Sequence, residues 1–230
     1  MGQDNRSRKG RYMNQEQGEP AEDDLEYQRI LNNYKQYLQF YPNAAEVYYN
    51  LGLVHTQFHH LNEAIDAYNK AIGLKPGLVQ AYLNLAGIYL HTGGPEQSLA
   101  WIQRAIAIEP GFAPAYSNLG FIYIQQGRLD EGIEACKKAM EIDPRSSDAC
   151  LKLALAYLKK EDYNGVITAS VKALELNPEL GLAENYLGVA YYHKKEFRPA
   201  VEHCGRALAL GFQVDPALLK TLEPYVPGSE

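Results

Sequence analysis

The chain has 230 residues, 46% of them hydrophobic, and a formal net charge of −6. Because the balance is acidic and no long basic stripe is present, nucleic acid is not expected as a partner. The three cysteines are odd in number and lack a C-x-x-C motif, so neither a disulfide framework nor a zinc site is signalled. No run approaches the roughly 18 apolar residues of a membrane span. With an N-terminus that lacks a signal peptide, this predicts a soluble, cytoplasmic protein without membrane insertion.

The N-terminal segment, residues 1–22, is polar and has no hydrophobic periodicity. Such a segment cannot bury enough apolar surface to fold, so we expect a disordered arm. Residues 23–42 contain the stretch DLEYQRILNNYKQYLQFY, in which apolar residues recur at helical spacing. We expect one helix there, which covers the exposed face of the patterned region that follows.

From residue 43 to residue 212 the sequence repeats every 34 residues. A proline, a leucine, a small residue directly after the leucine, and an alanine all recur at this period. They are Pro42, Pro76, Pro110, Pro144 and Pro178; Leu51, Leu85, Leu119, Leu153 and Leu187; Gly52, Ala86, Gly120, Ala154 and Gly188; Ala71, Ala105, Ala139, Ala173 and Ala207. The spacings within each unit are helical, so each unit should hold two amphipathic helices.

In the third unit the helices are expected at about 113–126 and 129–142, with a turn at Gly127. Gly93 marks the corresponding turn of the second unit. The small residue after each leucine would let the two helices of a unit approach closely. A bulky side chain there would cost about 1–3 kcal/mol by overpacking.

The motif Y-x2-L-G-x2-Y from Tyr116 to Tyr123 resembles the tetratricopeptide repeat (TPR), with tyrosine in the place of the signature's tryptophan. The resemblance implies an all-α fold, a right-handed α-solenoid of five TPR helix pairs over residues 43–212. Residues 23–42 would be an N-terminal half repeat, and residues 213–230 would hold a C-terminal capping helix and tail.

Three positions depart from the repeat pattern. Val166 fills a normally small position, Phe212 stands at the proline place that ends the fifth repeat, and His55 stands where the other repeats have tyrosine. Beyond the repeats, Asp215-Pro216 is typical of a helix start, with an N-cap followed by proline at the first helical position. The capping helix should therefore begin there.

In the TPR family the first helix of each pair lines the concave side of the solenoid. The resemblance thus places Asn50, Asn84 and Asn118 in a ladder on the groove wall. An Asn amide both donates and accepts hydrogen bonds, so it can pair with a peptide backbone. Neighbours that share this surface and could form pockets are Tyr49, Leu53, Leu83, Ser117 and Phe121. Lys152 and Tyr186 take the asparagine place in the last two repeats, and Lys159 could join Lys152 in binding an acidic group.

Explanations without a binding role stay open for these asparagines and lysines. Asparagine is common at this place in idealised TPRs, so repeat duplication alone also explains the ladder, and the two lysines could simply be solvated. The carboxylate clamp of related TPR proteins needs Lys and Asn where this chain has Tyr49 and Leu53. Chaperone tails are therefore not expected partners.

His55 and His59 lie four residues apart, which suits a metal on one helix face. His55 also falls at a packed position, so we expect no metal site. Cys136, Cys150 and Cys204 occupy aromatic positions of the repeat and are expected in the core. No catalytic constellation or phosphate-binding loop stands out, and no cofactor is expected.

The leading functional prediction is a non-enzymatic adaptor. It would bind an extended or helical segment of a partner protein in the concave groove. The alternative is a self-assembling scaffold, a homo-oligomer in which the N-terminal arm or a cap helix of one protomer docks in another's groove.

Overall fold

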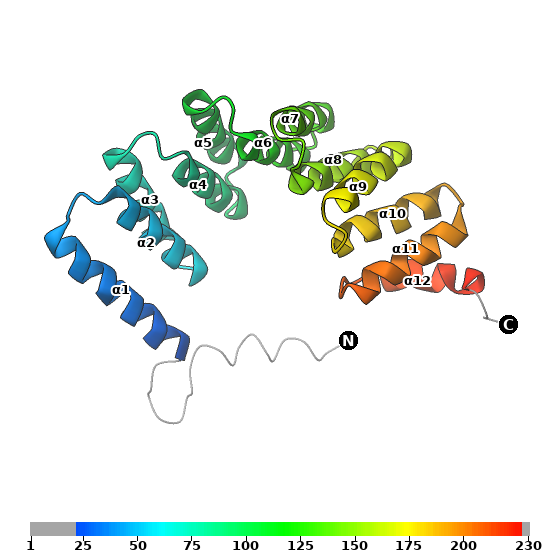
Figure 1. Cartoon of the computed structure of the whole chain (residues 1–230), viewed down its shortest axis with the longest axis horizontal. Coiled ribbons are helices and arrows are strands. Elements are labelled where there is room, and N and C mark those ends of the chain that lie inside the picture. The colour runs from blue at the N-terminus through cyan, green and yellow to red at the C-terminus, as the bar shows by residue number, and fades with distance from the viewer. Residues whose placement is uncertain (1–21, 227–230) are drawn as a thin grey trace. The chain divides into compact units, whose positions relative to one another are not determined.

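The structure is a computed structural model that describes residues 22–226. The arm predicted at residues 1–22 therefore lies outside the described residues, apart from Glu22, where the first helix begins. The described residues form twelve α-helices and one short 3₁₀ helix and contain no strand (Figure 1). The predicted all-α fold class is confirmed.

The chain divides into two compact units, residues 1–88 and 89–230. The first unit holds α1 (Glu22–Phe40), α2 (Ala45–Gln57), α3 (Leu61–Leu74) and most of α4 (Val79–His91). The second unit holds α5 (Pro95–Ile108), α6 (Ala113–Gln125), α7 (Leu129–Ile142), α8 (Ser147–Lys159), α9 (Tyr163–Leu176), α10 (Gly181–His193), α11 (Phe197–Ala209), α12 (Pro216–Leu222) and η1 (Glu223–Tyr225).

The helices follow the 34-residue period closely. The first helices of the five pairs, α2, α4, α6, α8 and α10, are each 13 residues long. The expected helices of the third repeat are present as α6 and α7, and α7 ends two residues before Pro144. Within the second unit, α7 packs on α8 and α9 on α10, so each second helix contacts the first helix that follows.

The turn between the two helices of each pair contains one residue with positive φ. The sequence predicted this turn at Gly93 (φ 85°) and Gly127 (φ 76°), where glycine adopts the left-handed region without a Cβ clash. At the same place in the other three pairs the structure has His59 (φ 62°), Glu161 (φ 60°) and Lys195 (φ 61°). The repeat therefore imposes the turn conformation even where the residue does not favour it.

Where the small residue after the leucine is glycine, it lies at a point where the helices of a pair touch. A Cβ at Gly120 would overlap the thiol of Cys136 and lie 3.0 Å from the backbone oxygen of Gly132. At Gly52 it would overlap the ring of Tyr68. These distances leave no room for a side chain, so the predicted close contact is confirmed.

The three cysteines are buried, as their aromatic positions predict. Burial raises the pKa of the Cys136 thiol to about 12, so this thiol stays protonated at neutral pH. In the fourth repeat the matching place of the second helix holds Ser170. Its hydroxyl is buried and has no hydrogen-bond partner.

Helices outside the repeats pack against the first and last helix pairs. Tyr27 and Leu31 of α1 are buried against Leu51 and Ala67. At the other end, the Asp215 side chain accepts a hydrogen bond from the backbone N–H of Ala217, the N-cap that the sequence predicted. Leu222 of α12 is buried together with Ala200, Cys204 and Ala207 of α11. None of the helices in the described part of the chain is long and apolar enough to cross a membrane.

Candidate peptide-binding site

Three neighbouring first helices of the second unit, α6, α8 and α10, present a shared surface. These helices contact one another in order, α6 on α8 and α8 on α10. We count each repeat from the first residue of its first helix. Positions 2, 6, 9 and 13 then recur at helical spacing, so they lie on one side of each helix. The resulting first-helix face consists of Pro114, Asn118, Phe121 and Gln125; Asp148, Lys152, Leu155 and Lys159; Leu182, Tyr186, Val189 and His193.

Most side chains of this face are accessible to solvent. Eleven of the twelve side chains are exposed or half-buried, and the exception, Tyr186, is 8% exposed. The neighbouring positions that carry the repeat motif, such as Leu153 and Leu187, are buried among the helices. The first-helix face is therefore a surface that a ligand can reach.

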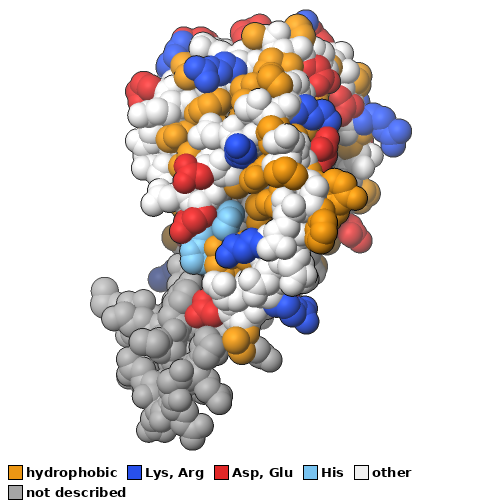
Figure 2. All heavy atoms as spheres, turned by 90° about the vertical axis from the view of Figure 1, so that its left-hand side faces the viewer, with side chains coloured by type: hydrophobic (Ala, Val, Ile, Leu, Met, Phe, Trp, Pro, Cys, Tyr) orange, Lys and Arg blue, Asp and Glu red, His pale blue; other side chains and the backbone are white. Residues whose placement is uncertain are grey.

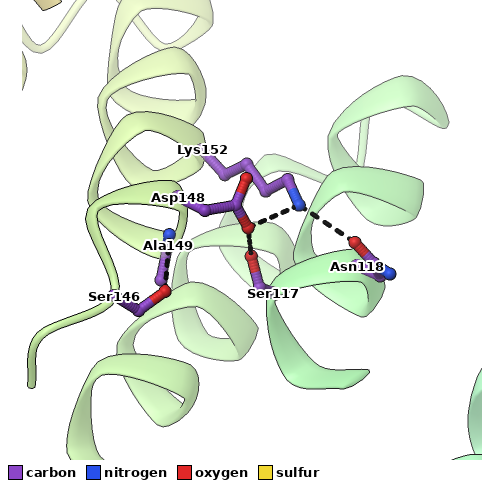
Figure 3. A network of polar contacts seen from close by, with 6 residues as sticks. All are labelled: Ser117, Asn118, Ser146, Asp148, Ala149 and Lys152. Carbon is purple, nitrogen blue, oxygen red and sulfur yellow. Dashed lines mark hydrogen bonds and ion pairs between the residues drawn. The ribbon is translucent and has the colours of Figure 1, made fainter. Parts of the chain in front are cut away.

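A polar network joins α6 to α8 on this face (Figure 3). The ammonium of Lys152 donates to the Asn118 side-chain oxygen over 2.9 Å and to Asp148 Oδ2 over 2.8 Å. The same Asp148 oxygen accepts from the Ser117 hydroxyl over 2.5 Å. The Lys152 ammonium also lies 5.9 Å from the centre of the Phe121 ring. Asp148 and four residues named from the sequence, Ser117, Asn118, Phe121 and Lys152, thus lie in one network.

The network changes what these residues offer to a ligand. Ser117 is buried and committed to Asp148, so it supports the surface from below. The oxygen of the Asn118 amide is used by Lys152, which leaves the amide nitrogen as the group to meet a peptide. Lys159 is exposed at the end of α8. The structure pairs Lys152 with Asp148, whereas the sequence grouped it with Lys159.

The first unit arranges its matching residues differently. The Asn84 amide nitrogen donates to the Tyr49 hydroxyl over 3.4 Å. The Tyr49 ring packs on Tyr68, with centroids 5.9 Å apart. Burial raises the pKa of the Tyr68 hydroxyl, and hydrogen bonds to Thr56 and Asn84 oppose this effect. This cluster is uncharged. Of the remaining predicted residues, Asn50 and Leu83 are half-buried and Leu53 is exposed.

A pocket of about 280 Å³ lies at the α10 end of the first-helix face. Val189 and His193 of α10 line it together with Tyr192 and with Asp215, Ala217, Leu218 and Thr221 from the α12 segment. The His193 ring stacks on Tyr163 with centroids 4.7 Å apart, which fixes one wall. The pocket is mostly apolar and can hold a small apolar side chain.

The histidines of the first repeat have packing roles. His55 Nδ1 lies 2.8 Å from the Tyr27 hydroxyl, and the His60 ring stacks on Tyr27 with centroids 4.3 Å apart. Burial lowers the pKa of His55, which favours the neutral ring. His59 occupies the positive-φ turn. Among residues 22–226 there is no group of three or more His, Cys, Asp or Glu side chains placed to hold a metal ion.

Sequence reasoning missed Asp148, Leu155, Val189 and His193. The signal was present, because these residues occupy positions 2, 9 and 13 of their repeats. Treating every exposed position of the first helices alike would have found them. The partnership of Asp148 with Lys152 is a common helical spacing of four residues, but its link to Ser117 and Asn118 spans two repeats.

Several solved structures of other proteins share the fold of this chain. The structure of MamA matches with a TM-score of 0.61 and 25% sequence identity over 70% of this chain and 94% of the MamA chain. PilF of Pseudomonas aeruginosa matches with a TM-score of 0.69 and 20% identity over 80% and 93% of the two chains. YrrB, described as a TPR protein with an unusual peptide-binding site, matches with a TM-score of 0.60 and 16% identity over 83% and 97%. A search of curated proteins finds no match.

Family models for the tetratricopeptide repeat match the sequence in four consecutive blocks. One model matches residues 45–78 and 113–146, and a second matches residues 79–112 and 147–180. The block boundaries coincide with the starts of α2, α4, α6 and α8. The α10–α11 pair continues the same arrangement, since a Cβ at Gly188 would lie 2.5 Å from the Cys204 thiol. The chain belongs to the tetratricopeptide repeat family.

Proposed function

We propose that this protein is a non-enzymatic adaptor that binds an extended or helical segment of a partner protein. The observation that carries the proposal is the first-helix face, on which three adjacent helices expose apolar side chains beside amide and charged groups. TPR repeats generally serve as protein-interaction modules. The peptide-binding site described for YrrB belongs to a chain that shares this fold.

The chemistry of the face suits an extended chain. Packed helices lie roughly 8–10 Å apart, and an extended chain advances about 3.3 Å per residue. The side chains at position 6 of α6, α8 and α10, which are Asn118, Lys152 and Tyr186, would therefore meet roughly every third peptide residue. Asn118 supplies an amide donor to the backbone, while Phe121, Leu155 and Val189 offer apolar contact beside it.

The test replaces Asn50, Asn84 and Asn118 together by alanine. Alanine is the better helix former, so circular dichroism should show an intact fold. Affinity capture with the wild-type chain identifies a partner, and titration of that partner should show weaker binding by about 0.5–1.5 kcal/mol for each hydrogen bond lost. The matched control replaces Asn62, Asn69 and Asn164, which are exposed on second helices. If the two triple variants bound the partner with equal affinity, Asn50, Asn84 and Asn118 would not be peptide contacts.

A second candidate function, self-assembly, is favoured by the exposed side of α1. Leu25, Tyr37, Phe40 and Tyr41 are all largely exposed, and Phe40 reaches 77%. Figure 2 faces the α1 side and shows hydrophobic side chains at the surface. In each full repeat the place of Tyr37 is held by a buried alanine, such as Ala71 or Ala105.

Self-assembly through α1 can be tested by the mass of the protein in solution. The full chain is compared with the double variant Phe40→Ser and Tyr41→Ser and with a chain that begins at Asp23. Concentration-dependent dimers that are lost only in the double variant would favour docking of α1. A monomer at all concentrations would leave the adaptor as the proposed function.

A further inference from the structure

The charge of Lys152 is neutralised within the chain. Its side chain is only 18% exposed, whereas that of Asp148 is 62% exposed. The ammonium has two acceptors within 2.9 Å, Asp148 and Asn118. A solvated lysine would be free to turn toward a ligand, but this one is held between α8 and α6 (Figure 3). The group that faces solvent here is the carboxylate.

The arrangement of Asp148 is supported from its own side as well. The Ser117 hydroxyl, which is buried, donates to the oxygen that Lys152 contacts. Two donors from two helices thus fix the carboxylate in one orientation. Other members of the first-helix face on α6 and α8, namely Asn118, Phe121 and Leu155, are uncharged. Near the α6–α8 junction the face therefore has no net charge.

We propose that Asp148 determines ligand specificity by keeping Lys152 unavailable to acidic ligands, an inference that rests on the proposed peptide-binding function. A ligand carboxylate that approaches Lys152 must either displace Asp148 or lie beside its exposed charge. Two carboxylates side by side repel each other, and displacing Asp148 would break its hydrogen bonds from Lys152 and Ser117. The face accordingly selects uncharged, apolar-rich segments and excludes segments with glutamate or aspartate at this point.

The test compares the full chain with Asp148→Asn. Asparagine has the same shape and can still accept from Ser117 and Lys152, but it leaves the ammonium without a counter-charge. The probes are two short fluorescent peptides of one apolar sequence, which differ only in having glutamines or glutamates at the same places. Their binding is measured by fluorescence anisotropy at low and high salt.

We expect the wild-type chain to bind the glutamine peptide more tightly than the glutamate peptide. The Asp148→Asn variant should bind the glutamate peptide about tenfold more tightly than the wild type does, a modest gain for a charge-assisted contact. High salt should reduce this gain. Adding Lys152→Met to the variant should abolish the gain, because the ammonium is then absent.

The matched control is Glu141→Gln. Glu141 also pairs with a lysine, Lys138 at 2.9 Å, but it lies on α7, a second helix. The Glu141→Gln substitution changes the net charge by the same amount as Asp148→Asn. An equal gain in affinity for the glutamate peptide in this control would show that overall charge explains the effect and would overturn the inference. An unchanged peptide preference in Asp148→Asn, with glutamine-peptide binding retained, would overturn the inference alone. If no variant bound either peptide, the groove function itself would fall, and the inference with it.

Discussion

The first repeat (α2–α3) and the third repeat (α6–α7) place different side chains on one backbone arrangement. At the helix contact, Gly52 faces the ring of Tyr68, whereas Gly120 faces the Cys136 thiol and the backbone of Gly132. The positive-φ turn residue is His59 in the first repeat and Gly127 in the third.

The two repeats also differ in their long-range partners. His55 of the first repeat meets Tyr27 of α1, which no later repeat has as a neighbour. Asn118 of the third repeat accepts from Lys152, one repeat further along. Helix geometry is therefore determined by residues within one repeat, whereas the role of a side chain depends on the neighbouring helix or repeat that it contacts. Substitutions at these contacts and turns should separate the two contributions.

The largest effect is expected where the third repeat brings backbone against backbone. Gly120→Leu should destabilise the second unit by about 3 kcal/mol, because the backbone of Gly132 and Cys136 cannot move aside as a flexible side chain could. Coupling between adjacent repeats should carry the damage to its neighbours. Chemical denaturation followed by circular dichroism measures the loss.

The control for this substitution is Gly205→Ala in α11, where a Cβ would meet no atom within 4 Å. That change should raise stability by up to about 1 kcal/mol through helix propensity. If Gly120→Leu left the denaturation curve unchanged, the assigned repeat boundaries would be wrong.

Two buried serines of the second unit should respond with opposite sign. Ser170 has no hydrogen-bond partner, so Ser170→Ala should stabilise the chain by about 1 kcal/mol. Ser117 donates to Asp148, so Ser117→Ala should cost about 1 kcal/mol. Both variants are measured by urea denaturation. A common sign for the two changes would contradict the assignment of partners.

The turn residues give a smaller and more local test. His59→Gly should stabilise the first repeat by about 0.5–1 kcal/mol, because glycine adopts positive φ without a Cβ clash. Gly127→Ala should destabilise the third repeat by about 1 kcal/mol for the same reason. Thermal melting of the two variants and of Glu161→Gly provides the comparison. A gain from Gly127→Ala would show that the turn can adopt another conformation.

The smallest effect concerns pH and should be confined to the first unit. Burial lowers the pKa of His55 from its ordinary value of 6.5, although Glu63 partly opposes the shift. As the pH falls through about 6.5, the unfolded chain takes up a proton that the folded chain resists, so stability should decrease. Hydrogen exchange of α2 amides between pH 7.5 and 5.5 measures this loss, which His55→Gln should reduce. Equal acid sensitivity in that variant would assign the effect to other groups.

The sequence by itself determined the helix pairs, their boundaries and their close contacts. These features depend on residues within one 34-residue unit, and five copies report the same spacing, so Gly52, Gly120 and Gly188 could be assigned before any coordinates. Capping at Asp215 was likewise readable, because its partner is two residues away. Even so, neither Glu161 nor Lys195 is a residue type that indicates positive φ, and there the tertiary packing of the pair overrides residue preference.

Tertiary structure alone decided which residues of the candidate site contact one another. Ser117 and Asp148 are 31 residues apart, and Asn118 and Lys152 are 34 apart, so their contacts exist only once α6 and α8 have packed. Periodicity identifies which side of a helix a residue occupies, but it does not identify the partner across the interface. Lys152 therefore looked like a free cation in the sequence and is a neutralised one in the fold, because its counter-charge comes from its own helix and its second acceptor from the neighbouring repeat.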